Sequence, residues 1–322
     1  MDKRLELISA VGIVPTIEID DEKKAVPLAK ALVAGGLPIA EVTFRTDAAE
    51  ESIHRISQEC PEVLVGAGTV LTCKQVDMAL EAGSKFIVTP GFHPEVIRYA
   101  LSKGALVIPG TSTPGEMEQA MGLGLNVVKF FPAEQNGGAA KLKALSGPYK
   151  TLKWLPTGGI DIAKINEYLS CDQVLACGGS WMAKQELIKN EDWDGITALC
   201  KETVRTMLGF KVVHVGMNCK DAAEAEQVAR LFCYLFDVPY LPNETAIFAG
   251  SLVECIKGPY LGAHGHIAIG TNNVDRAVYQ LKKRGVIFDE SSRKVDAQGH
   301  TTLIYFKEEI GGFALHLVKS KP

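Results

Sequence analysis

A lysine inside an apolar stretch is the first candidate for chemistry in this sequence. Lys129 lies in NVVKFFPA (126–133), where a cation would lose its hydration unless it had a partner or a role. Alternate side chains of a strand share a face, so Val127, Lys129 and Phe131 would point the same way. Burial disfavours the charged ammonium form, and a Schiff-base nucleophile requires a neutral amine. The alternatives are a structural ion pair with a carboxylate and an outward-facing lysine.

A second polar face lies in PIAEVTFR (38–45), where Glu41, Thr43 and Arg45 alternate with apolar residues. Polar groups on an inward strand face are costly unless they are paired or line a site. Glu41 can serve as a general acid or base, and Arg45 as a two-pronged binder of carboxylates. Thr69, near the end of VLVGAGTV (63–70), adds a hydroxyl at the same rim. The alternative is an ion pair between Glu41 and Arg45, which their separation of roughly 13 Å along an extended strand weakens.

Two further strand-like runs end in paired glycines. LKWLPTGG (152–159) ends in Gly158-Gly159, and QVLACGGS (173–180) ends in Gly179-Ser180 after another glycine. Glycine lets the backbone approach a ligand closely, and unpaired amides at such turns bind phosphate. The sequence therefore predicts a phosphate site at these two ends. Tight turns that hold no ligand are the alternative.

Five of the seven histidines lie after residue 208. His214, His266 and His316 are each embedded in an apolar strand-like run, and Glu254 lies in another, SLVECIK (251–257). Four such groups would form a site for a first-row metal ion if they converged. Histidines in strands are also common as surface or core residues that are satisfied by hydrogen bonds, so the spacing alone leaves both interpretations open.

The elements that would position these residues recur at even intervals. Short apolar runs alternate with helical segments roughly every 20 to 25 residues. Eight strands alternating with helices favour an α/β fold, a (β/α)8 TIM barrel, over an open doubly wound sheet. The eight runs are GIVPTIEI (12–19), PIAEVTFR (38–45), VLVGAGTV (63–70), KFIVTPG (85–91), ALVIPGTS (105–112), NVVKFFPA (126–133), LKWLPTGG (152–159) and QVLACGGS (173–180).

The rhythm changes near Leu208-Gly209-Phe210. From there a strand, a helix and short strands occur twice in succession, which predicts an α+β domain of paired βαβββ modules. The helical segments of the two modules are DAAEAEQVARLFCYLF (221–236) and NVDRAVYQLKKRG (273–285). We therefore expect two domains, 1–208 and 209–322, which are joined without a flexible glycine- or serine-rich linker.

Composition limits the class of protein. The 322 residues are 47% hydrophobic and 22% charged, which fits globular folding. A net charge of -4 provides no basic field for nucleic acid, and the apolar runs are too short for a membrane helix. The first residues lack the apolar stretch of a signal peptide, and the eight cysteines form no C-x-x-C pair. We expect a cytoplasmic enzyme with reduced thiols, and neither a nucleic acid nor a membrane as partner.

The motifs of the first two thirds together resemble the family of 2-keto-3-deoxy-6-phosphogluconate (KDPG) aldolases, which also cleave 4-hydroxy-2-oxoglutarate (KHG). The resemblance implies a carbon–carbon lyase of class I that needs no cofactor, acts on a small keto acid and forms a homotrimer. The sequence departs from many relatives at Thr16-Ile17-Glu18, where they carry an apolar or basic residue, and this bears on substrate preference. The matching stretches, in order over residues 1 to about 205, are VPTIEI, ALVAGG, EVTFRT, VGAGTV, TPG, IPGTST, KFFPAE with NGG, PTGGI and GGSW.

The resemblance also implies roles for individual residues. Lys129 would form an imine with the substrate ketone, and Glu41 would shuttle protons. The imine would accept the electrons of the C3–C4 bond as it breaks, which gives pyruvate with glyceraldehyde 3-phosphate from KDPG or with glyoxylate from KHG. The substrate carboxylate and the cleft would involve Arg45, Thr69, Pro90, Phe131 and Thr157, and the phosphate would bind Gly158, Gly159, Gly179 and Ser180.

The last third is similar to the glyoxalase and vicinal-oxygen-chelate superfamily, whose paired βαβββ modules enclose a divalent metal. The stretches HVGM, VECIKGPY, GHIAIG and FALHLV carry this resemblance. It implies a zinc, nickel, iron or manganese site at His214, Glu254, His266 and His316, the last standing where many members have glutamate. The superfamily includes metal-free binding proteins, so a binding, a regulatory and a second catalytic role all stay open. In the alternative, metal-dependent glyoxalase or isomerase chemistry of this domain is the main activity.

Overall fold

The computed structural model describes residues 2–320, and the chain divides into two compact units between Met207 and Leu208. The division lies one residue before the boundary that the sequence predicts. Within residues 2–320, no helix combines the length and the apolar character needed to cross a bilayer.

Eight parallel strand positions form a closed ring in the first unit, as the sequence predicts. Two segments on either side of Pro109 together make the fifth position. The strands pair in the orders β5-β4-β3-β2-β1-β9 and β6-β7-β8, and a parallel bridge between Thr157 and Gly178 joins the two ends. The strands are β1 (Ile13–Ile17), β2 (Ile39–Thr43), β3 (Leu64–Gly68), β4 (Ile87–Val88), β5 (Val107–Ile108), β6 (Gly110–Thr111), β7 (Val127–Phe130), β8 (Lys153–Pro156) and β9 (Cys177–Gly179).

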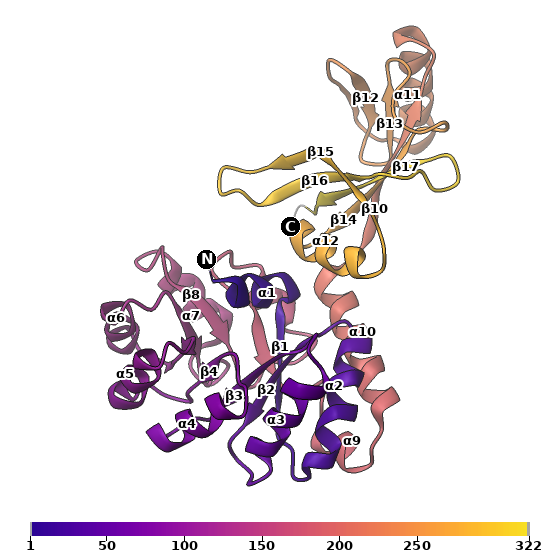
Figure 1. Ribbon diagram of the computed structural model, residues 1–322. Coiled ribbons are helices and arrows are strands. Elements are labelled where there is room, and N and C mark those ends of the chain that lie inside the picture. Colours follow the sequence, from indigo (N-terminus) through magenta and orange to yellow (C-terminus); the bar gives the residue numbers. More distant parts are fainter. Residues whose placement is uncertain (1, 321–322) are drawn as a thin grey trace. The chain divides into compact units, whose positions relative to one another are not determined.

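Helices follow the strands and surround the barrel (Figure 1). Several begin where the sequence supplies a cap: Thr113 and Glu116 form a reciprocal capping box at the start of one helix, with Pro114 in its first turn. The helices are α1 (Lys3–Val11), the 3₁₀ helix η1 (Glu22–Lys24), α2 (Ala25–Ala34), α3 (Ala49–Glu59), α4 (Cys73–Glu81), α5 (Pro94–Ser102), α6 (Pro114–Gly122), α7 (Gly138–Ser146), α8 (Ile165–Leu169), α9 (Gln185–Lys189) and α10 (Trp193–Leu208).

Glycines in β3 make room for large side chains inside the barrel. A Cβ atom on Gly66 would lie within 2.5 Å of the Phe86 ring, and one on Gly68 would lie 2.4 Å from Oε1 of Glu41. The barrel interior is filled with side chains. The large side chains next to these two positions leave room only for glycine.

The second unit contains the two βαβββ modules that the sequence predicts, joined in one eight-stranded sheet. Its strand order is β11-β12-β13-β10-β14-β17-β16-β15, and the first strands of the two modules, β10 and β14, pair antiparallel at its centre. The elements are β10 (Lys211–Asn218), α11 (Ala222–Phe236), β11 (Tyr240–Pro242), β12 (Ala246–Ala249) and β13 (Val253–Ile256), then β14 (His266–Thr271), α12 (Val274–Lys283), β15 (Phe288–Val295), β16 (Thr301–Phe306) and β17 (Ala314–Lys319).

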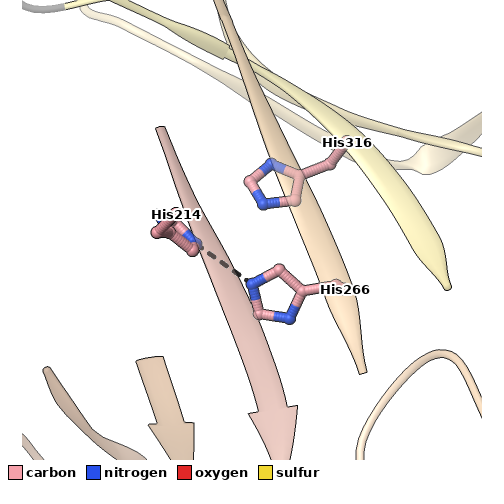
Figure 2. A group of neighbouring side chains, drawn as sticks. All are labelled: His214, His266 and His316. Atoms are coloured by element: carbon pink, nitrogen blue, oxygen red, sulfur yellow. Dashed lines mark hydrogen bonds between the residues drawn. The ribbon is translucent and has the colours of Figure 1, made fainter. Parts of the chain in front are cut away.

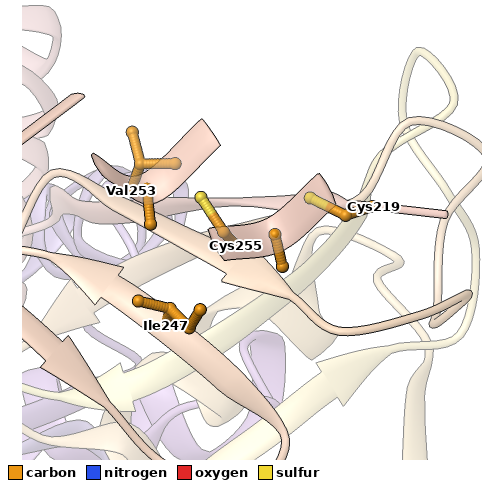
Figure 3. Packing of buried hydrophobic residues seen from close by; sticks show 6 residues of the cluster. Cys219, Ile247, Val253 and Cys255 are labelled. Atoms are coloured by element: carbon orange, nitrogen blue, oxygen red, sulfur yellow. The ribbon is translucent and has the colours of Figure 1, made fainter. Parts of the chain in front are cut away.

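The first of these modules has a small apolar core between its helix and its strands (Figure 3). Cys219, Ile247, Val253 and Cys255 pack there with Ala225 and Ala229 of α11, and each is at most 8% exposed. These thiols are packing residues in a buried cluster, and all eight cysteines of the chain are free.

Candidate active site

The barrel site centres on a buried pair of opposite charges. Lys129 on β7 is 5% exposed and Glu41 on β2 is fully buried, and Nζ of the lysine lies 3.2 Å from Oε1 of the glutamate. The second carboxylate oxygen of Glu41 is buried and has no hydrogen-bond partner in the described chain. The lysine nitrogen also lies 5.2 Å from the centre of the Phe131 ring. A buried carboxylate oxygen without a partner is costly, which favours a hydrogen-bond donor from a ligand at this position.

The two side chains meet although 88 residues separate them in sequence. Strand β2 lies between β1 and β3, and β7 lies between β6 and β8, so the pair spans the barrel interior. The intrastrand pair of Glu41 with Arg45, which the sequence left open, is therefore wrong. Lys129 does form an ion pair with a carboxylate, as one alternative proposed, but that carboxylate belongs to Glu41, which is itself a candidate catalytic residue.

Only part of the polar face predicted for residues 38–45 lies on the strand. Thr43 is the last residue of β2, and its hydroxyl donates to the carbonyl of Ile17 at 2.9 Å, which is a link between strands. Arg45 lies beyond the strand end with its side chain 48% exposed, and its Nη1 is 3.5 Å from Oε2 of Glu18. The sequence reasoning extended the strand by two residues, so Arg45 belongs to the rim.

A cavity of about 570 Å³ is lined by seven of the predicted residues, but Lys129 and Glu41 are not among the residues that line it. Its wall comes near the pair at Phe131, whose ring centre lies 5.2 Å from Nζ of Lys129. Thr16 and Thr157 present buried hydroxyls to it that lack a hydrogen-bond partner among the described residues. The predicted residues on its wall are Arg45, Phe131, Thr157, Gly158, Gly159, Gly179 and Ser180.

Thr69 and Pro90 do not line this cavity in the described structure. Thr69 follows β3 and adopts a φ of 57°, a conformation that is unusual for a β-branched residue. The carbonyl of Pro90 packs against Gly110, where a Cβ atom would lie 2.2 Å from it.

The glycines of the predicted phosphate site are required for different reasons. Gly158 and Gly159 have φ values of 101° and 75°, which side chains rarely adopt. At Gly179 an added Cβ would lie 1.9 Å from the ring of Trp181. Packing against tryptophan thus explains Gly179 without a ligand, whereas the first two are required by their backbone conformation, and an added Cβ at Gly159 would also lie 2.8 Å from the side chain of Glu134.

Glu134 contacts the turn that follows β8. Its backbone N–H donates to the carbonyl of Gly158 at 3.1 Å, and its carboxylate accepts hydrogen bonds from Lys164 and Tyr168. The hydrogen bond from Lys164, followed by that from Tyr168, lowers the pKa of Glu134. The carboxylate is therefore ionised and neutralised by its own partners beside the glycine turn.

Sequence reasoning missed several residues of the cavity wall. Ile160, Trp181, Ala183 and Lys184 line it from the loops after the last two barrel strands, and Gln185 lines it from the first position of α9. Their position in the sequence could have identified them, because the residues that follow the carboxyl ends of barrel strands form the site in this architecture.

In the second unit, three predicted metal ligands converge (Figure 2). One ligand atom from each of His214, His266 and His316 lies within 4.8 Å of the others, and the Nε2 atoms of the first two are 3.1 Å apart. Oε2 of Glu254 is 3.2 Å from both of those atoms. Gly216 leaves room for this group, since its Cβ atom would lie 2.0 Å from the His266 ring.

The environment of these ligands suits binding to a cation. Burial, together with the nearby His266 and His214, lowers the pKa of His316 to about 4, so its ring is neutral at pH 7. The pKa of Glu254 is about 2, because hydrogen bonds from His214 and His266 outweigh its desolvation. Neutral imidazole and ionised carboxylate are the forms that bind metal ions.

The closed barrel and its buried lysine place the first unit among the class I aldolases, which are carbon–carbon lyases. More particularly, the chain belongs to the KDPG and KHG aldolase family, whose model matches residues 5–199. The matched residues lie within the barrel unit, so the family match supports aldolase activity for that unit.

Individual relatives agree with this assignment. A 2-dehydro-3-deoxy-phosphogluconate aldolase from Treponema pallidum is 46% identical over 200 residues, which are 62% of this chain and 95% of that protein. A KHG/KDPG aldolase from Escherichia coli K12 is 43% identical over 62% of this chain and 93% of its own length. Among solved structures, the KDPG aldolase of Legionella pneumophila, with pyruvate captured as a covalent carbinolamine, has 38% identity and a TM-score of 0.60, covering 62% of this chain and 97% of that one.

Proposed function

We propose that the barrel unit cleaves KDPG to pyruvate and glyceraldehyde 3-phosphate, KHG to pyruvate and glyoxylate, or both, through a Schiff base on Lys129. The observation that carries this proposal is the contact of 3.2 Å between the buried side chains of Lys129 and Glu41, near the cavity wall at Phe131. A carboxylate at that distance can take a proton from the ammonium group and leave a nucleophilic amine.

The same carboxylate can serve the later proton transfers. Attack of Nζ on the substrate ketone gives a carbinolamine, and Glu41 returns the proton it took from the ammonium group to the carbinolamine hydroxyl, which leaves as water and gives a protonated imine. Glu41 then accepts the proton of the C4 hydroxyl, directly or through water, and the C3–C4 bond breaks toward the imine nitrogen. The aldehyde leaves, and Glu41 returns a proton to C3 of the enamine before water releases pyruvate and restores the amine. A positioned group of this kind contributes on the order of 10² to 10⁴ in rate.

The remaining wall residues would hold the two ends of the substrate. We assign the carboxylate to Arg45, with Phe131 and Thr157 around the cleft, whereas Thr69 and Pro90 lie outside its wall and would act only on the residues that line it. The phosphate of KDPG would bind the turn amides at Gly158 and Gly159 together with Gly179 and Ser180. The positive φ values of the first two and the anchoring of their turn by Glu134 support this assignment.

Borohydride trapping with pyruvate tests the chemistry. Reduction should join pyruvate irreversibly to the native chain and add its mass to the peptide that contains Lys129, whereas Lys129→Ala should give no adduct. Lys141→Ala is a matched control, because this lysine donates to the carbonyl of Ser112 at 2.8 Å and is not paired with Glu41. An adduct of equal yield in Lys129→Ala would refute the assignment.

For the second unit we propose a divalent metal site formed by His214, Glu254, His266 and His316. Donors bound at about 2.0–2.2 Å to a tetrahedral ion lie roughly 3.3–3.5 Å apart. The measured separations of 3.1 and 3.2 Å among three of the four donors are close to that spacing. The ion would supply Lewis acidity, and its role in this protein would be binding, regulation or a second reaction.

Two further expectations concern the whole protein. We propose that it works in the cytoplasm and that it forms a homotrimer, as the family resemblance implies. Light scattering of the full chain tests the assembly, and a mass of one or two chains would contradict it.

A further inference from the structure

Glu18 introduces a negative charge into the wall of the barrel cavity. It follows directly after β1 and lines the cavity together with Arg45 and Lys184. One carboxylate oxygen accepts a hydrogen bond from Nε2 of Gln185 at 3.0 Å, and the other lies 3.5 Å from Nη1 of Arg45. Its side chain is 35% exposed. The catalytic steps proposed above leave this carboxylate without a function.

The hydrogen bond to Gln185 fixes the side of the cavity on which this charge lies. Gln185 and Lys184 belong to the segment that follows Gly179 and Ser180, where the proposed phosphate site lies. Through its two contacts Glu18 lies between Arg45, which we assign to the substrate's carboxylate, and the segment beside the proposed phosphate site, so its charge can act on the substrate's tail. Of the charged side chains on the cavity wall, Arg45 is assigned to the substrate's carboxylate, Lys184 attracts an anionic tail, and Glu18 repels it.

We propose that Glu18 is a specificity-determining residue that weakens the preference for a phosphorylated tail over a carboxylate tail. The proposal rests on the proposed aldolase function and deepens it. A phosphate monoester carries about −1.5 to −2 charges at pH 7, against −1 for the terminal carboxylate of KHG. At equal distance the carboxylate of Glu18 therefore opposes the first tail about 1.5 to 2 times as strongly as the second, and salt screens both effects.

Kinetics of Glu18→Gln on both substrates test this proposal. The substitution keeps the side chain's size and an acceptor for Gln185 and removes the charge. We expect the ratio of kcat/KM for KDPG to that for KHG to rise about two- to five-fold at low salt and to fall back toward the native ratio at high salt. Lys184→Met removes a cation from the same wall and should move the ratio in the opposite direction.

Asp20→Asn is the matched control, because it removes the same charge two residues away on an exposed side chain that does not line the cavity. It should leave the ratio unchanged. If Glu18→Gln lowered both activities equally, Glu18 would only orient Arg45, and an unchanged ratio would also overturn the proposal. Trapping of pyruvate, which has no tail, should be the same in Glu18→Gln and the native chain. Failure of trapping in the native chain would instead count against the aldolase chemistry.

Discussion

Lys129 and Glu41 each lack any other charged partner within the described structure, so each compensates the charge of the other. Removing one member of a buried ion pair leaves an uncompensated charge in the interior and costs about 3–5 kcal/mol, while replacing both is far less costly. Stability can therefore distinguish the pair's structural role from its chemistry.

We predict that Lys129→Met lowers the free energy of unfolding of the barrel by about 3 kcal/mol, because the Glu41 carboxylate stays buried without its cation. The double variant Lys129→Met with Glu41→Gln should recover more than half of that loss, although neither variant can form the imine. Urea unfolding followed by tryptophan fluorescence measures both. Additive losses in the double variant would contradict mutual compensation.

For individual residues, the sequence indicated which side chains could act chemically more accurately than it indicated which residues they contact. Lys129 and Glu41 were identifiable because a charged side chain in an apolar strand loses its hydration, which is costly unless the side chain is paired or lines a site. Arg45 was identified too, but its contact with Glu18 was not, because it depends on the exact ends of β1 and β2. Periodicity does not fix those ends to within two residues.

The strands position Lys129 and Glu41 in two ways: they carry these side chains, and a glycine on a neighbouring strand leaves the volume that one of them fills. Strand β3 runs beside β2, and Gly68 near its end leaves the volume that the Glu41 side chain fills. The carboxylate therefore depends on a neighbouring strand for its direction toward Lys129.

We predict that Gly68→Ala lowers kcat at least ten-fold while the chain stays folded. The new methyl group would lie 2.4 Å from Oε1 of Glu41, so the carboxylate must turn away from Lys129. Gly115→Ala is the control, since an added Cβ there meets nothing within 4 Å. Steady-state cleavage rates and circular dichroism separate lost chemistry from lost folding, and a Gly68→Ala enzyme with native kcat would show that the pair tolerates reorientation.

The barrel and the paired modules were predictable from the alternation of strands and helices, since each unit repeats the same elements. The division of the fifth barrel position at Pro109 was not, because both segments lie in one apolar run, ALVIPGTS. The role of Gly179 was likewise hidden, because it depends on where the ring of Trp181 packs. Local patterns predict elements, whereas side-chain packing between loops determines these details.

At the scale of the whole molecule, the chain joins a catalytic barrel to a unit with a different kind of site. Each unit has its own sheet and its own buried core. The charged pair of the barrel and the histidines of the second unit share no residue, so removal of a metal ion should affect one unit and spare the other.

We predict that zinc or nickel stabilises the second unit and leaves imine formation unchanged. An ion that binds only the folded state at a free concentration of 100 times its Kd adds about 2.7 kcal/mol to the free energy of unfolding. Calorimetry of the full chain should therefore show one transition that moves to higher temperature with metal and returns with chelator. His214→Ala and His266→Ala should abolish that shift, whereas His300→Ala, on an exposed loop side chain, should retain it.

Borohydride trapping of pyruvate should give the same yield with metal and with chelator. A shift that survived in both cluster variants would place the ion elsewhere, and loss of trapping on chelation would mean that the barrel depends on the metal.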